Sequence, residues 1–216
     1  MAALCWLCPP GSGPERFACV GGEIPGQLAP FTVTLVVNSS GAVQRQSATW
    51  FLSNGDLAHG PGLIFDYGMM GRDVIPTPIG LSVVALVKLS PRPKAKAADI
   101  VLLLGGAEKA RRAWQLYAKA ISAPVDPTKT PAAFVGGVPF YPGGVDDVGL
   151  KAILAAVGHP GAAVEARIVG DDGGILADGT MQVDRPPARD APTVSALLDQ
   201  ALALAKTPTR CHKLAN

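Results

Sequence analysis

The four cysteines are the first residues whose types and spacing suggest a site. Cys5 and Cys8 form a C-x-x-C pair, Cys19 follows them, and Cys211 precedes His212 at the other end of the chain. Two thiolates on one tight turn can occupy two positions around a tetrahedral zinc ion. Cys19 with Cys211 or His212 would complete the site if the two ends meet. The alternatives are a redox-active C-x-x-C pair and four unlinked, reduced thiols, and we expect the unlinked thiols.

A second candidate site is the pair Gly105-Gly106, which follows a buried apolar run. Apolar residues at intervals of three and four predict a helix over 108–121, directly after this pair. The free N–H groups at its start could bind a phosphate or carboxylate, with Arg111 and Arg112 adding positive charge. No complete nucleotide-binding glycine pattern is present, so a plain strand-to-helix connection is the simpler interpretation.

Basic residues gather in the middle of the chain. Residues 61–120 carry nine basic and four acidic side chains, including the cluster Lys88, Arg92, Lys94 and Lys96. Such a cluster can contact a nucleic-acid backbone. Aromatic residues are not interleaved with it, so stacking on single strands is not indicated. We therefore favour a solvated loop, or a surface that meets an acidic protein, over nucleic-acid binding.

The residues suited to catalysis do not form a recognisable set. The three histidines, His59, His159 and His212, have no partner at the spacing of metal ligands. His59, Asp66 and Asp73 could perform acid–base chemistry if they converged, but nothing in their spacing requires this. The sequence therefore predicts no assembled catalytic centre and no cofactor apart from the zinc alternative.

Composition points to protein–protein contact. The chain has 216 residues, of which 48% are hydrophobic and 17% charged, with a net charge of +2. An average globular protein has about 25% charged residues, so apolar surface is expected to remain after folding. Trp6, Met69, Met70, Phe140 and Tyr141 are predicted to be exposed. The chain has no run of about 18 apolar residues and no secretory signal pattern. We therefore expect no membrane segment and a cytoplasmic location, alone or within a particle.

The periodicity of the sequence predicts an α+β fold. Alternating residues predict two hairpins, over 31–38 with 42–52 and over 163–169 with 175–183. Further strands are expected at 63–67, 81–89, 99–104 and 132–135. Further helices are expected from Asp146 or Asp147 to Val157 and from Asp190 to Ala205. The expected architecture is an antiparallel, β-rich N-terminal half, sandwich or barrel-like, followed by about three helices and a β-hairpin.

These elements suggest an irregular arm over 1–30, a single domain over 31–206 and a polar tail over 207–216. A boundary near 123–131 is the alternative to the single domain. We expect a non-enzymatic structural or assembly protein that forms a homo-oligomer or part of a larger particle through apolar surface and extended arms. The alternatives are a phosphate- or nucleotide-binding enzyme that uses Gly105-Gly106, and a zinc-stapled adaptor.

Overall fold

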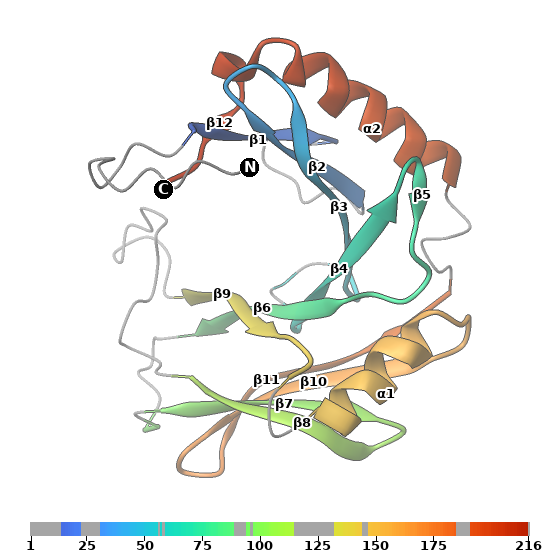
Figure 1. Ribbon diagram of the computed structural model, residues 1–216. Coiled ribbons are helices and arrows are strands. Elements are labelled where there is room, and N and C mark those ends of the chain that lie inside the picture. The colour runs from blue at the N-terminus through green and yellow to red at the C-terminus, as the bar shows by residue number, and fades with distance from the viewer. Residues whose placement is uncertain are drawn as a thin grey trace. The chain divides into compact units, whose positions relative to one another are not determined.

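A computed structural model of the chain divides into two compact units, residues 1–48 with 192–216 and residues 49–191. Figure 1 labels the helices and strands of both units. The structure describes residues 14–22, 31–55, 57, 59–88, 94–95, 97–114, 132–143, 147–184 and 191–215.

The first unit is a small sheet with one helix. Its strand order is β12-β1-β2-β3, and β3 continues into the second unit. The elements are β1 (Arg16–Gly21), β2 (Phe31–Asn38), β3 (Val43–Leu52), α2 (Ala191–Ala205), the 3-10 turn η2 (Pro208–Arg210) and β12 (His212–Lys213). In β2, residues 31, 33, 35 and 37 are buried and their neighbours half-buried, as the alternating sequence predicts.

Helix α2 packs closely against β1. Gly21 makes this approach possible, because a Cβ atom there would lie 2.0 Å from the carbonyl oxygen of Leu197. The helix buries a stripe of small and branched residues, namely Val194, Leu198, Ala201 and Ala205. This spacing agrees with the amphipathic helix expected at the end of the chain.

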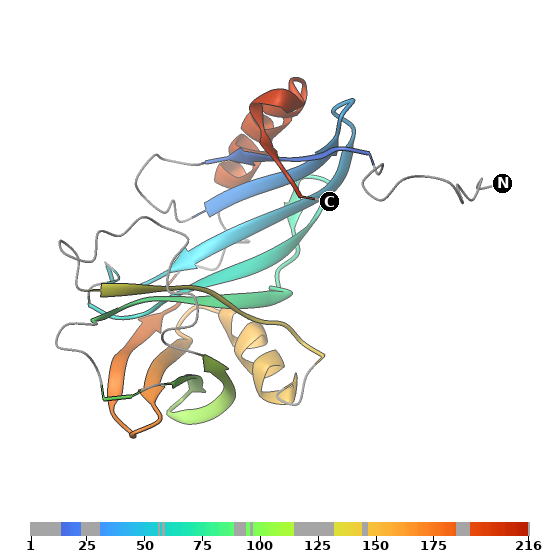
Figure 2. The same cartoon turned by 90° about the vertical axis from the view of Figure 1, so that its left-hand side faces the viewer.

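The second unit contains two sheets and one helix. One sheet has the order β3-β4-β6-β9, with β5 paired to β4, and the other the order β11-β10-β7-β8. Their elements are β4 (Gly62–Met70), β5 (Asp73–Val74), β6 (Gly80–Lys88), β7 (Ala98–Leu104), β8 (Ala107–Trp114), β9 (Ala132–Phe140), α1 (Asp147–Val157), β10 (Ala163–Gly170) and β11 (Ile175–Gln182). Figures 1 and 2 place the four-stranded sheet and α1 on one side of β6 and β9.

The core of the second unit is built from the continuous apolar runs. Residues 81, 83–85 and 87 of β6 are buried, as are residues 100–103 of β7. Strands buried on both faces need such runs, in contrast to the alternation of β2. The rings of Trp50 and Phe65 lie 5.9 Å apart in this core.

The helix expected over 108–121 is wrong for its first part, because residues 107–114 form strand β8. β8 pairs antiparallel with β7 through the two-residue turn Gly105-Gly106. Both glycines have positive φ, 60° and 77°, which is the backbone of a tight hairpin turn rather than a helix start. The described residues thus contain two α-helices, not about three, while the β-rich α+β character is confirmed.

The two ends of the chain carry more regular structure than expected. Within the expected irregular arm, residues 16–21 form β1, and within the expected polar tail η2 and β12 are found. The alternative boundary near 123–131 lies outside the described residues. Neither α1 nor α2, the α-helices of the described ranges, is long and apolar enough to cross a membrane.

Candidate interaction surface

Strand β4 changes its partner halfway along its length. Up to Asp66, which pairs with Gly80, it runs beside β6, whereas Met69 and Met70 pair with the short strand β5. The segment after β5 returns along β4, since the N–H of Ile75 donates to the Gly68 carbonyl (2.9 Å) and that of Ile79 to the Asp66 carbonyl (2.7 Å). This exchange of partners gathers residues 66–80 at one end of the sheet.

Two glycines let side chains lie directly on the strands here. A Cβ atom on Gly80 would lie 2.3 Å from Cδ1 of Tyr141, and one on Gly68 would lie 2.8 Å from Cδ1 of Ile75. Both distances are shorter than van der Waals contact, so any larger residue would displace the side chain above it.

The Tyr141 ring is also fixed by a hydrogen bond. Its Oη atom donates to Oδ2 of Asp66 at 2.5 Å. Asp66 stands directly opposite Gly80 in the β4–β6 ladder, so the carboxylate and the ring share one face. A hydrogen bond to a charged acceptor is stronger than one between neutral groups.

Four large apolar side chains are exposed in residues 66–80 and at Tyr141. Met70 is 74% exposed, Ile75 39%, Ile79 42% and Tyr141 48%. We call these four residues, together with Asp66, the Tyr141 surface. Exposed tyrosine and methionine are enriched at protein–protein interfaces. Of the residues expected to be exposed, Met70 and Tyr141 are exposed and Met69 is half-buried.

The prediction that Phe140 is exposed is wrong, because only 3% of this residue is exposed. It pairs with Leu81 of β6, and the guanidinium of Arg112 lies 5.2 Å from the centre of its ring. Arg112 also donates a hydrogen bond to the Pro139 carbonyl. Trp6, the remaining residue expected to be exposed, lies outside the described residues.

The predicted anion site depended on a helix that begins after Gly106, but a strand follows there instead. Successive residues of a strand point to opposite faces, so Arg111 and Arg112 do not converge. Arg111 contacts Asp99 at 2.6 Å and Glu108 at 2.8 Å. The hydrogen bond from Arg111 lowers the pKa of the Glu108 carboxyl, so the charge of Arg111 is already compensated. Gly105 and Gly106 form the hairpin turn between β7 and β8, so no helix follows them directly.

The expected basic cluster is only partly described. Lys88 ends β6, and Lys94 is exposed. Arg92 and Lys96 lie outside the described residues, so nucleic-acid contact by this cluster stays a prediction.

The cysteines correct the expectation of four unlinked, reduced thiols, and they also bear on the zinc alternative. Cys19 and Cys211 form a disulfide, with their Cα atoms 4.7 Å apart. Two of the candidate ligands are therefore bonded to each other, while Cys5 and Cys8 lie outside the described residues. His212 stands opposite Ala18 on β12. In the part of the chain that the structure describes, no three His, Cys, Asp or Glu side chains group as metal ligands. Acid–base chemistry by His59, Asp66 and Asp73 stays a prediction from the sequence.

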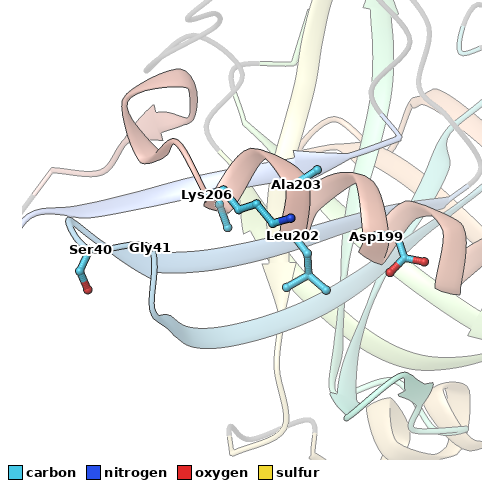
Figure 3. Close-up of a pocket in the computed structure, with 7 residues that line it drawn as sticks. Ser40, Gly41, Asp199, Leu202, Ala203 and Lys206 are labelled. Carbon is cyan, nitrogen blue, oxygen red and sulfur yellow. The ribbon is translucent and has the colours of Figure 1, made fainter.

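A shallow groove of about 560 Å³ lies in the first unit, between the β2–β3 turn and α2 (Figure 3). The β2–β3 turn and the end of α2 approach closely at Gly41, where a Cβ atom would lie 2.5 Å from the Ala205 carbonyl oxygen. Its charged residues are Asp199 on α2 and Lys206 directly after the end of α2 (Figure 3).

Comparison of the chain with known protein families, with curated proteins and with solved structures finds no match. Function must therefore be inferred from the surfaces described above.

Proposed function

We propose that this chain is a non-enzymatic structural or assembly protein that associates with further copies of itself through the Tyr141 surface. The observation that carries the proposal is the joint exposure of Met70, Ile75, Ile79 and Tyr141 at one end of the β4–β6 sheet. Exposed apolar area of this kind is removed from water when it packs against another protein, which favours association.

The surface is ordered before any partner arrives. The Tyr141 ring is restricted by its hydrogen bond to Asp66 and by its close packing on Gly80. A side chain that is already restricted loses less conformational entropy on binding. This arrangement supports a binding role for the exposed ring.

A second copy of the chain is the partner that best fits the charge of the molecule. The net charge is only +2, so two copies repel each other weakly. Two-fold dimers place one patch against the same patch of a neighbour, which suits a surface that is mainly apolar. A stable interface needs about 800 Å² from each partner, so the patch must be the centre of a larger contact.

Sedimentation velocity on the Met70→Lys variant tests the proposal. Met70 is the most exposed residue of the surface, so a lysine there places a charge in the contact without disturbing the core. The matched control is Val148→Lys, which changes another exposed apolar residue, on α1, that is 85% exposed.

We expect the wild-type chain and the Val148→Lys control to associate between about 1 and 100 μM, and Met70→Lys to dissociate roughly tenfold more readily. A wild-type chain that is monomeric over this whole range would overturn the proposal. Equal association of Met70→Lys and wild type would overturn the assignment to this surface.

A further inference from the structure

The disulfide joins the two ends of the first unit. Cys19 lies in the middle of β1 and is completely buried, whereas Cys211 follows η2 and is half-buried. The two residues are 192 positions apart. The bond therefore fastens the segment after α2 to the edge of β1.

Among the described residues, the other contacts between this segment and the β1 strand are short. β12 has two residues, His212 and Lys213, which pair with Ala18 and Phe17. The N–H of Leu214 donates to the Arg16 carbonyl at 2.9 Å, and Lys213 forms an exposed ion pair with Glu15. Exposed ion pairs contribute little to stability, and two residues make a very short strand.

We propose that residues 207–215 are a clasp, closed by the Cys19–Cys211 disulfide, and that after reduction the edge of β1 accepts the same segment from a second copy. This goes beyond the proposed function, because it uses residues of the first unit and none of the Tyr141 surface. Either idea can therefore fail without the other.

The edge of β1 already binds residues 207–215 of its own chain, so the same segment of a second copy is the partner expected there. A strand edge with unpaired backbone groups accepts any extended segment, but this edge carries a cysteine and Glu15 at positions matched to Cys211 and Lys213. An exchanged segment makes the same contacts in the neighbour as in its own chain, so exchange costs little. It requires a high local concentration of copies, because a linked segment has an effective concentration in the millimolar range.

The chemistry is ordinary thiol–disulfide exchange. A thiolate attacks Sγ of Cys211, the more accessible sulfur, and the electron pair of the broken S–S bond leaves with Cys19, which takes up a proton. A second thiol releases Cys211, so two thiols become one disulfide. In the reverse direction, oxidised glutathione accepts two electrons as Cys19 of one copy bonds to Cys211 of another, and two molecules of reduced glutathione leave.

Isotope mixing tests the exchange on the full-length chain. Cys5→Ser and Cys8→Ser are introduced so that Cys19 and Cys211 are the remaining thiols. Equal amounts of ¹⁴N- and ¹⁵N-labelled chain are reduced, brought to about 1 mM, reoxidised with oxidised glutathione and digested for mass spectrometry. We expect the Cys19–Cys211 peptide pair to include mixed-isotope links, and these to fall roughly tenfold or more when the same steps are run at about 1 μM.

Two further variants make the outcome decisive. In Cys211→Ser, the Leu214 amide should exchange its hydrogen at least about tenfold faster, because the clasp is open. Adding Met70→Lys to the double-serine chain should leave the mixed-isotope links unchanged, which separates this proposal from the Tyr141 surface. Pure-isotope links alone at both concentrations would overturn the exchange, and unchanged protection of Leu214 would overturn the clasp.

Discussion

Tyr141 and Asp66 are 75 positions apart in the sequence, yet Oη of the tyrosine lies 2.5 Å from a carboxylate oxygen of the aspartate. The ring lies on Gly80, which pairs with Asp66 across the β4–β6 ladder. The exposed tyrosine is therefore positioned by the sheet below it and not by its own loop alone.

This arrangement predicts that Gly80→Ala destabilises the protein by about 1–2 kcal/mol, because the new methyl group displaces the Tyr141 ring from its seat. Urea unfolding measures the change. In the Tyr141→Ala background the same glycine substitution should cost about 1 kcal/mol less, since the ring is gone. If the changes in unfolding free energy of Gly80→Ala and Tyr141→Ala were simply additive, the close contact between Gly80 and the Tyr141 ring would be contradicted.

A second glycine allows α1 to approach β8. A Cβ atom on Gly149 would lie 1.9 Å from the carbonyl oxygen of Lys109, a backbone atom that cannot swing aside. Alanine normally stabilises a helix interior by about 1 kcal/mol relative to glycine, but Gly149→Ala should instead destabilise the protein by about 2 kcal/mol. Unfolding by urea, with Ala155→Gly as an exposed helix control costing about 1 kcal/mol, tests this reversal of sign.

Elements with one buried and one more exposed face are among those predicted correctly from the sequence. In β2, every second residue is buried, and α2 buries residues at intervals of three and four. In such elements the periodicity of the sequence reports directly which side chains face the core. The fold class could therefore be predicted.

β8 shows where this reasoning fails. Alanine, glutamate, lysine and arginine favour helices, and their spacing fitted one, but pairing with β7 takes precedence over local propensity. The signal for a strand was Gly105-Gly106 itself, because two adjacent glycines between extended runs favour a hairpin turn. Without the helix, the anion site lost its basis.

The Tyr141 surface and the disulfide could not be predicted for a different reason. Asp66, Gly80 and Tyr141 meet through strand pairing, and Cys19 meets Cys211 through the edge of β1. Such long-range contacts leave no local periodicity in the sequence. Met70 and Tyr141 were identified only as residues expected to be exposed.

The buried hydroxyl of Tyr67 leads us to expect that the folded state loses stability at alkaline pH. It is 1% exposed, and within the described ranges its buried hydroxyl has no hydrogen-bond partner. Burial raises the pKa of this hydroxyl above its ordinary value of 10.0. The unfolded chain therefore loses this proton first as the pH rises, so the full stability is present below about pH 10 and is lost above it, at up to about 1.4 kcal/mol for each pH unit.

Tyr67→Phe removes both the unsatisfied hydroxyl and its ionisation. We expect the variant to be as stable as wild type or about 1 kcal/mol more stable at pH 7, and the advantage to grow by pH 11. Urea unfolding at the two pH values measures this. An advantage that stays constant with pH would show that Tyr67 does not titrate differently in the folded state.

The Cys19–Cys211 disulfide is also expected to raise the free energy of unfolding, apart from any exchange between copies. A bond between residues 192 positions apart restricts almost the whole unfolded chain, and closing so long a loop stabilises a protein by about 3–5 kcal/mol. Cys211→Ser should therefore unfold at a lower guanidinium concentration than oxidised wild type. With Cys5 and Cys8 also replaced by serine, the chain that keeps Cys211 should approach the Cys211→Ser variant in a reducing buffer, whereas the variant itself should not respond to the reductant. Equal midpoints for oxidised wild type and Cys211→Ser would show that the bond does not contribute to the folded state.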